Sequence, residues 1–178
     1  MKAVLISIQP KWCELIASGK KTVEVRKTKP KIETPFKCYI YCTQGNGYLE
    51  SVNGKVQKLN YLELDLNVDN YVYELNGKVI GEFVCDKIIK LNYSCGSYRC
   101  EGLDRVENDR IASASQLSLY DMKNYLTCKG GYAWHISDLV IYDKPKELRE
   151  FNHCGVNYHF NPPITRPPQS WCYVEELR

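Results

Sequence analysis

The first residues of the chain show a strand and then a helix in their hydrophobic pattern. Ala3–Ile8 is a short apolar run rich in β-branched residues, which predicts a strand. Pro10 suits the first turn of a helix, and apolar residues from Trp12 onward recur at helical spacing. Gly19 suits the left-handed end of such a helix. We therefore predict a helix over residues 10–18.

Strict alternation follows over Thr22–Lys27. Val23 and Val25 point to one face of the predicted strand, whereas Glu24 and Arg26 point to the other. This pattern is typical of a half-buried strand, with the valines in a core and the charged residues on the opposite face.

The rest of the chain reads as strands with few helices. Asn76-Gly77 is the strongest hairpin signal, Gly81 indicates a bend or bulge, and Ser115 is placed to cap a helix. Strands are predicted over residues 38–43, 71–75, 78–91, 133–142 and 170–175, an edge strand over 61–68, helices after 115 and 145, and irregular loops over 44–69 and 92–112. Because strands and helices do not alternate regularly, we expect an α+β fold, a small mixed β-barrel with two or three flanking helices.

Composition adds limits on size and location. A chain of 178 residues, 44% of them hydrophobic, suits one domain over residues 1–178, with loop insertions near 44–70 and 92–112. The net charge of +3 is too small to indicate a nucleic-acid-binding protein by itself. The nine cysteines are an odd number, and the first apolar run is too short for a signal peptide or a membrane span. We therefore expect a cytoplasmic protein with reduced thiols.

The strongest site candidate is the basic stretch over residues 20–31, which holds five lysines, one arginine and one glutamate. Two lysines lie at the corner between the predicted helix and strand. A glutamate can accept hydrogen bonds from a base edge, and an arginine can clamp a phosphate. The alternative is a solvated strand face with an ordinary surface ion pair. The ligand-binding candidates from this stretch are Lys20, Lys21, Thr22, Glu24, Arg26 and Lys27.

The order of strand, short helix, Gly-Lys-Lys-Thr-x-Glu-x-Arg and strand resembles the ASCH family (activating-signal-cointegrator homology). Three further stretches strengthen the resemblance, namely Gly77–Phe83, Tyr132–Ile136 and Arg166–Glu175. They resemble a subgroup common in phages and prophages of low-GC bacteria. The resemblance covers most of the chain. It implies a PUA-like β-barrel with flanking helices that binds RNA or a nucleotide in a cleft between the first helix and the motif strand.

The resemblance leaves the question of catalysis open, because some ASCH members are enzymes. One branch hydrolyses N4-acetylcytidine with a lysine, a threonine and a glutamate, and another has been described as a ribonuclease. Lys21 matches that lysine, but Glu24 occupies the position of the catalytic threonine, and Thr22 is the other, structural threonine. A carboxylate cannot replace a hydroxyl nucleophile in that scheme. A metal-independent ribonuclease would use Glu24 or His135 as base, with Lys21 and Arg26 stabilising the phosphate.

Two further groups of residues are candidates. Trp134 can stack on a base and His135 can act as acid or base, but neighbouring strand residues point to opposite faces, so only one of them lines a given surface. A core tryptophan and a surface histidine are the alternatives. Trp171, with Gln169 and Ser170 beside it, either reaches a ligand as the tail folds back or anchors a closing strand.

The cysteines and the known cofactor motifs add little. Cys95, Cys100, His153 and Cys154 would hold zinc only if their loops met, and buried reduced thiols are the preferred interpretation. Phosphate-binding glycine loops, dinucleotide fingerprints and zinc-protease motifs are missing from the sequence. We expect no metal and no cofactor.

Three functional hypotheses remain. The first is a protein that binds RNA, a nucleotide or a modified nucleoside, without membrane association. The second is a hydrolase, either a ribonuclease or an enzyme resembling a nucleoside amidohydrolase. The third is a phage-type protein that sequesters a host nucleotide, or a host protein that the sequence does not identify, through the two loop insertions.

Overall fold

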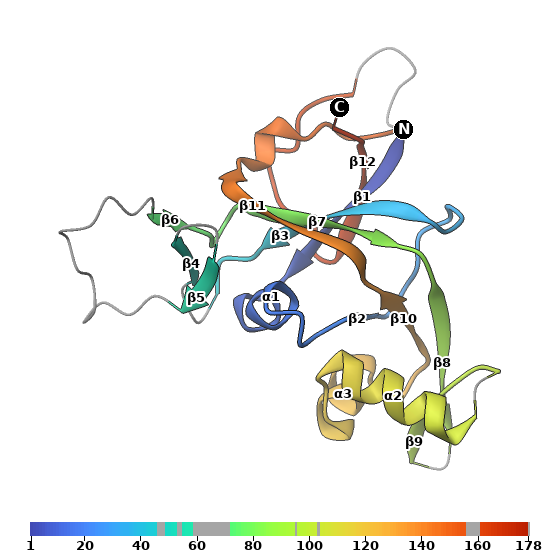
Figure 1. Cartoon of the computed structure of the whole chain (residues 1–178). Helices are drawn as coiled ribbons and strands as arrows, with labels where there is room; N and C mark the ends of the chain where they lie inside the picture. The colour runs from blue at the N-terminus through green and yellow to red at the C-terminus, as the bar shows by residue number, and fades with distance from the viewer. Residues whose placement is uncertain are drawn as a thin grey trace. The chain divides into compact units, whose positions relative to one another are not determined.

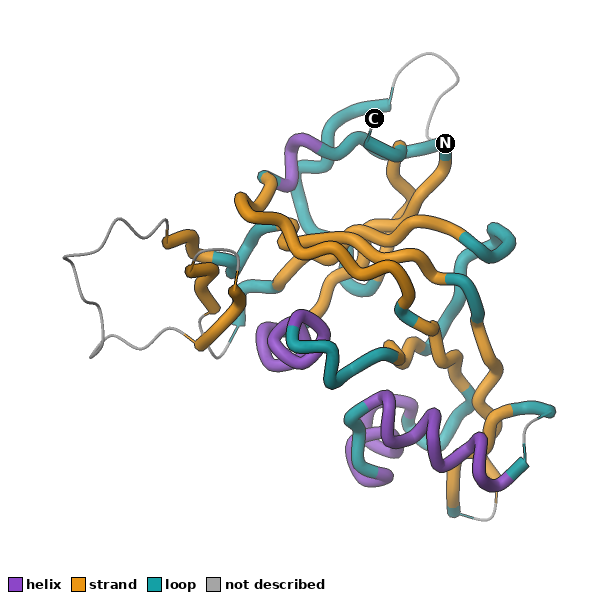
Figure 2. Tube along the Cα trace, in the orientation of Figure 1, coloured by secondary structure: helices purple, strands orange, loops and turns teal. Residues whose placement is uncertain are grey.

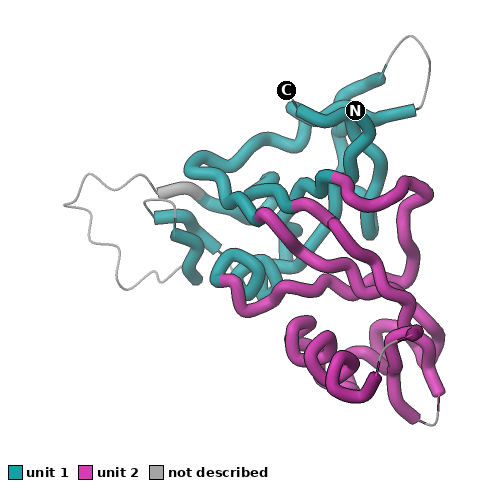
Figure 3. The backbone as a smooth tube through the Cα atoms, turned by 45° about the vertical axis from the view of Figure 1, so that its right-hand side comes forward, with its two compact units in different colours: residues 1–18, 37–83, 139–178 teal, residues 19–36, 84–138 magenta. Residues whose placement is uncertain are grey.

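The computed structural model describes residues 1–45, 49–52, 55–58, 72–94, 96–102, 104–155 and 161–177. The chain forms two compact units (Figure 3). Unit 1 comprises residues 1–18, 37–83 and 139–178, and unit 2 comprises residues 19–36 and 84–138. The expectation of a single domain stays a prediction.

Figure 1 shows a five-stranded sheet, most of which belongs to unit 1. β1 runs parallel to β3 and antiparallel to β12. A cluster that includes Leu5, Tyr39, Val79, Phe151 and Val174 fills one core of this unit. The strands in spatial order are β11 (Ser137–Lys146), β7 (Val79–Cys85), β3 (Phe36–Cys42), β1 (Lys2–Ile8) and β12 (Trp171–Glu175).

Gly81 lets two of these strands approach closely. A Cβ atom at this position would lie 2.4 Å from the carbonyl oxygen of Val140 in β11. A side chain would therefore force β7 and β11 apart, which explains glycine in the middle of a strand. The predicted long strand over 78–91 ends after Cys85, and a second strand begins at Ile88.

Unit 1 also contains a three-stranded sheet, a helix and a single 3-10 turn. The strands in order are β5 (Lys55–Lys58), β4 (Leu49–Val52) and β6 (Val72–Glu74), and the helices are α1 (Pro10–Ala17) and η1 (Leu148–Glu150). The predicted hairpin at Asn76-Gly77 is wrong in its pairing, although Gly77 has the expected positive φ of 81°. β6 pairs with β4 instead of β7, and the Gly77 amide donates to the carbonyl of Cys42 in β3 (2.8 Å). The turn thus passes the chain from one sheet to another.

Unit 2 consists of a four-stranded sheet and two helices. The strands in order are β2 (Val23–Arg26), β10 (Gly131–His135), β8 (Ile88–Ser94) and β9 (Ser97–Cys100), and the helices are α2 (Arg105–Ser115) and α3 (Leu119–Leu126). α2 contacts β2 and α3 contacts β9. Figure 2 draws the helices in purple and the strands in orange. The valines of β2 pack with Ile89, Leu91, Leu126 and Ala133 in the core beneath these helices. The valine face predicted for β2 is therefore confirmed, but all four residues of the strand are buried, so the prediction of a half-buried strand is wrong.

The stretch over 92–112 is more regular than its polar sequence suggests. It contains the end of β8, β9 and most of α2. Asp104 caps α2 by accepting from the amide of Glu107, whose own side chain accepts from the amide of Asp104. Ser115 ends α2, and Ser118 caps α3, so the predicted cap at Ser115 is wrong. α2 has few apolar residues, so its sequence shows no clear helical periodicity. The Asp-x-x-Glu capping box at its start is the sequence signal that could have predicted it.

The fold class is confirmed as a mixed, sheet-rich α+β architecture with three α-helices in the described residues. Within the described ranges, none of the helices is both long and apolar enough to cross a membrane. The predicted edge strand over 61–68 lies outside the described residues. The predicted irregular loop over 44–69 is wrong in part, because β4 and β5 lie within it.

A polar contact across three strands of unit 1 yields a prediction about acid stability. Lys37 of β3 lies 2.8 Å from Glu82 of β7, and the Tyr142 hydroxyl of β11 donates to the same carboxylate (2.5 Å). Burial alone would raise the pKa of Glu82, but the hydrogen bonds from Lys37 and Tyr142 outweigh it and hold that pKa below its usual 4.5. A depressed carboxyl pKa stabilises the fold above about pH 4.5, and this stability is lost as the pH falls through the lowered value.

We expect Glu82→Gln to lower the free energy of unfolding by about 1–2 kcal/mol at pH 7. The difference from wild type should begin to shrink below about pH 4.5, where the carboxyl of the unfolded chain takes up a proton, and should shrink further as the pH falls through the lowered pKa of the folded state. Urea unfolding at pH 7 and pH 3.5 measures both values. A constant difference at the two pH values, or an equal loss in the exposed control Glu33→Gln, would contradict the assignment.

Candidate functional site

The site is built on β2, which stands at one end of the strand order in unit 2. β2 pairs antiparallel with β10, with Glu24 opposite Trp134 and Arg26 opposite Tyr132. Directly opposed residues of an antiparallel pair share a face. Glu24 and Arg26 therefore lie on the face away from the valine core, as the alternation of the sequence predicts.

Glu24 is held between two cations. One carboxylate oxygen lies 3.3 Å from Lys21 Nζ, and the other lies 3.0 Å from Arg26 Nη2. All three residues are buried, with exposed fractions of 2% for Lys21, 7% for Glu24 and 6% for Arg26. Such charges are stable in a protein interior only when they are paired, since each loses its hydration. The motif is thus a buried ionic cluster, and the alternative of an ordinary surface ion pair is wrong.

Lys21 also closes the C-terminal end of α2. Its ammonium donates to the carbonyl of Ser115 (2.6 Å), and the backbone amide of Thr22 donates to the carbonyl of Ala114 (3.0 Å). The last carbonyls of a helix have no partner within the helix and carry partial negative charge, which a cation stabilises. Residues 21 and 22 therefore join β2 to α2 through the backbone and through charge.

The environment of Lys21 shifts its proton equilibrium. Burial lowers the pKa of Lys21 below its usual value, although the carboxylate of Glu24 opposes this shift; the positive charge of Arg26 adds to the lowering. Because the cluster contains two cations and one carboxylate, it keeps one net positive charge when all three groups are ionised. Its residual charge is therefore favourable to anions near β2.

Burial divides the predicted ligand-binding residues into two groups. Lys21, Glu24 and Arg26 present almost no surface in this structure, and Thr22 is half-buried. Lys20, just before β2, and Lys27, just after it, are exposed, as are Lys29 and Lys31. The exposed lysines at the two ends of β2 are thus the cations available to a ligand.

Trp134 and His135 point to opposite faces of β10, as predicted. Trp134 is fully buried and contacts Phe36 edge-on at 6.0 Å, which supports the interpretation as a core residue. His135 is opposite Val23, so it lies on the other face from Glu24. The candidates Glu24 and His135 therefore do not share one face of the sheet.

His135 forms an exposed pair with Asp86. Nδ1 of the imidazole lies 2.7 Å from Oδ1 of Asp86, and the two side chains are 42% and 45% exposed. Burial acts to raise the pKa of Asp86, but the hydrogen bond and the charge of His135 outweigh it and lower that pKa. Asp86 was missed by the sequence analysis because it lies 49 residues before His135 in the chain.

Gln169, Ser170 and Trp171 belong to unit 1. The Ser170 carbonyl accepts from the amide of Ser7 (2.9 Å), and Trp171 pairs with Ile6 at the start of β12. Trp171 also contacts Tyr173 edge-on at 5.4 Å. These contacts support the interpretation of an anchored closing strand, while Gln169 stays exposed.

The cysteines do not form a metal site in the described part of the chain. Among those residues, no group of three or more cysteine, histidine, aspartate or glutamate side chains is placed to share a metal ion. Cys100 is buried in β9 and Cys154 lies in a loop of unit 1, whereas Cys95 is outside the described residues. The eight described cysteines form no disulfide with one another.

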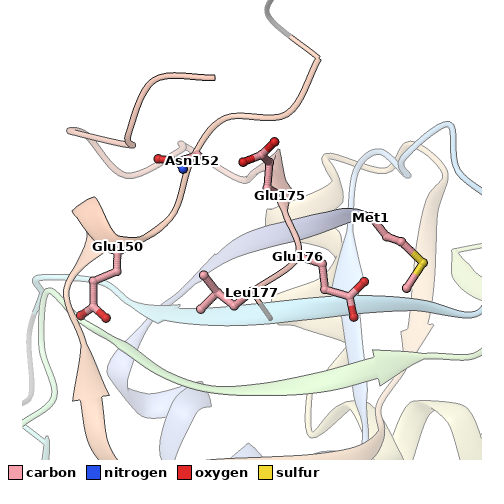
Figure 4. Close-up of a pocket in the computed structure, with 6 residues that line it drawn as sticks. All are labelled: Met1, Glu150, Asn152, Glu175, Glu176 and Leu177. Atoms are coloured by element: carbon pink, nitrogen blue, oxygen red, sulfur yellow. The ribbon is translucent and has the colours of Figure 1, made fainter. Parts of the chain in front are cut away.

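A pocket of about 310 Å³ lies within unit 1 and was not predicted (Figure 4). Its walls carry three carboxylates, and one of them, Glu175, accepts a hydrogen bond from Asn161 (2.8 Å). An acidic wall repels phosphate, so this pocket is a poor candidate for a nucleotide. The lining residues are Met1, Glu150, Asn152, Glu175, Glu176 and Leu177.

The buried cluster predicts a strong effect of removing its carboxylate. Glu24→Gln would leave Lys21 and Arg26 buried without their common counter-charge. We expect a loss of about 3–5 kcal/mol in the free energy of unfolding. Thermal and urea unfolding measure it, with the exposed Glu33→Gln of the same unit as control. A Glu24→Gln protein as stable as this control would contradict a structural role for the cluster.

Comparison with known proteins points to one family. A model of the ASCH domain matches residues 6–56, a range that contains β2 and the whole basic stretch. A search of curated sequences gave no significant match.

The solved structures that resemble the chain include ASCH from Zymomonas mobilis, with 19% identity, a TM-score of 0.59, and coverage of 98% of this chain and 88% of that one. A tyrosine-to-phenylalanine variant of that protein has 18% identity, a TM-score of 0.58, and coverage of 99% and 92%. A serine-to-alanine variant has 18% identity, a TM-score of 0.58, and coverage of 98% and 89%. The chain therefore resembles ASCH proteins in sequence over residues 6–56, and in fold over almost its whole length.

Proposed function

We propose that the protein binds RNA through the exposed lysines at the two ends of β2. The main support for this proposal is the arrangement of charged residues around this strand. A buried cluster, which has one surplus positive charge when its three groups are ionised, spans the start of β2, and Lys20 and Lys27 lie exposed on either side of it. Phosphate contacts of this kind dominate the affinity of proteins for nucleic acids.

The division of charge between the units supports this proposal. Unit 2 has 13 lysine and arginine residues against nine aspartate and glutamate residues, a net charge of +4. Since the whole chain carries +3, unit 1 has a net charge of −1. A modest total charge therefore hides a basic unit, and the net charge of the chain underestimates its attraction for a polyanion.

The buried residues of the motif have a positioning role in this proposal. Glu24 fixes Lys21 and Arg26, and Lys21 fixes the end of α2. The backbone that carries Lys20 and Lys27 is thereby held in place before a ligand arrives. Pre-positioned cations lose less conformational entropy on binding than mobile ones do. The match to the ASCH domain, a family whose members are expected to bind RNA, agrees with this assignment.

The salt dependence of binding tests the proposal. Replacing both Lys20 and Lys27 by alanine should weaken RNA binding and should reduce the slope of log affinity against log salt by about one per lysine. Fluorescence anisotropy with a labelled RNA at several salt concentrations measures both quantities. Lys144→Ala, an exposed lysine of unit 1, is the matched control. Wild-type affinity that is indifferent to salt, or an equal effect of the control, would refute the proposal.

A ribonuclease activity is the second candidate, and the His135–Asp86 pair favours it. Asp86 holds Nδ1, which leaves Nε2 to take the proton from a ribose 2′-hydroxyl. The 2′-oxygen would then bond to phosphorus while the bond to the 5′-oxygen breaks, and the leaving 5′-oxygen would take up a proton from water. Glu24 is less suited to act as the base, since it is buried and shared by two cations.

Cleavage assays in excess chelator test this second candidate. If His135 is the base, His135→Gln should slow cleavage by about 100-fold or more. Asp86→Asn should slow it less, because the imidazole itself remains. His153→Gln, a half-buried histidine of unit 1, should have no effect. Cleavage that survives His135→Gln at the wild-type rate would exclude His135 as the base.

Three narrower expectations stay predictions. They are membership of the phage and prophage subgroup, a location in the cytoplasm, and recognition of a free or modified nucleotide rather than a polymer. The hypothesis of a partner-binding surface on the 44–70 insertion falls largely outside the described residues.

A further inference from the structure

Three neighbouring strands of unit 2 place a tyrosine between two cations, one of which is Arg26 of the buried cluster. Tyr132 of β10 is opposite Arg26 of β2 on one side and opposite Lys90 of β8 on the other. Side chains in such a row share one face. Arg26 is buried, Tyr132 is half-buried and Lys90 is exposed. The face therefore opens to solvent along this row.

Two lysines just beyond β2 lie over tyrosine rings. Lys29 Nζ is 5.8 Å from the ring centroid of Tyr132, and Lys27 Nζ is 5.2 Å from that of Tyr125 in α3. Both lysines are exposed, and Tyr125 is 37% exposed. These distances are within the range of cation–π contacts, and the rings keep solvent-accessible surface.

The two pairs lie at the same end of β2, on its two sides. Tyr132 shares the face of Arg26, whereas Tyr125 belongs to α3, which packs on the valine face. Lys27 and Lys29 are two residues apart, which limits their Cα separation to about 7 Å. Tyr125 and Tyr132 flank the turn between α3 and β10. The start of β10 packs tightly on the end of β2 and on α3, because a Cβ on Gly131 would lie 2.9 Å from the carbonyl oxygen of Arg26 and 2.8 Å from the side chain of Leu126.

We propose that Lys27, Lys29, Tyr125 and Tyr132 form a stacking surface around the end of β2, with one ring on each side of the strand, for the unpaired bases of single-stranded RNA. This inference rests on the RNA-binding function proposed above and specifies the kind of RNA. A phenol ring offers a flat face to any base, while the neighbouring ammonium can move to a phosphate. In a duplex the base faces are covered by their neighbours, so a ring at the protein surface cannot reach them.

The charge of the surroundings agrees with a single strand as ligand. The pairs lie in the basic unit, next to the row that contains Arg26 and Lys90. Lys90 also forms an exposed ion pair with Glu101 (3.0 Å), and a phosphate can take the place of the Glu101 carboxylate. A combination of aromatic faces with flanking cations is the arrangement by which proteins bind single strands with little sequence preference.

The test compares Tyr132→Leu and Tyr125→Leu with the wild-type full chain. The probes are an unstructured single-stranded RNA and a duplex of the same length. Each substitution should weaken binding of the single strand by about 5-fold or more, and should leave duplex binding and the salt slope unchanged. Tyr132→Phe should retain wild-type binding, because it keeps the ring. Tyr120→Leu is the matched control, since Tyr120 lies on the same helix as Tyr125 and is 73% exposed.

A second readout reports stacking directly. An RNA that contains 2-aminopurine loses fluorescence when that base stacks on a ring, so the wild type should quench it and Tyr132→Leu should not. Circular dichroism and the melting temperature identify any variant that fails to fold. If Tyr132→Leu fails to fold, the effect of Tyr125→Leu is compared with that of Tyr132→Phe. Equal losses for duplex and single strand, or unchanged binding in both leucine variants, would overturn the stacking surface alone. A wild type that binds neither RNA would instead overturn the RNA-binding function.

Discussion

The buried contact of Lys21, Glu24 and Arg26 is the interaction on which unit 2 depends. One carboxylate pairs with two cations, and the ammonium of Lys21 also caps the last turn of α2. Each partner would be unstable in the interior alone, because burial removes the water that stabilises its charge. The three charges therefore specify one arrangement of strand and helix, in which β2 has its valines in the core and its charges on the opposite face.

This contact also separates the residues that build the site from those that meet a ligand. The charged residues of the cluster are the least accessible residues of the motif, whereas Lys20 and Lys27, which flank them, are exposed. Charge acts at the scale of the unit as well. The excess of basic over acidic residues lies in unit 2, whereas the pocket of unit 1 is lined by carboxylates.

Local sequence patterns were sufficient for several elements. The run before Pro10, the helix that follows it and the alternation in β2 appear as predicted, within one or two residues. Such segments carry their own signals, namely β-branched residues, a proline in the first turn and a period of two. The sequence did not predict α2, because this helix is polar. The predicted strands over 78–91 and 133–142 each divide into two strands that belong to different sheets. An apolar run does not show where a strand leaves one sheet for another.

The sequence by itself determined the elements around β2, the shared face of Glu24 and Arg26, and the resemblance to ASCH proteins. The tertiary structure alone decided that this face is buried, that Lys21 reaches Ser115, and that Asp86 holds His135. It also brought Tyr125 and Tyr132 to the lysines that follow β2. The reason is physical: periodicity and capping act between neighbours in sequence, whereas burial and charge pairing depend on residues that are distant in the chain.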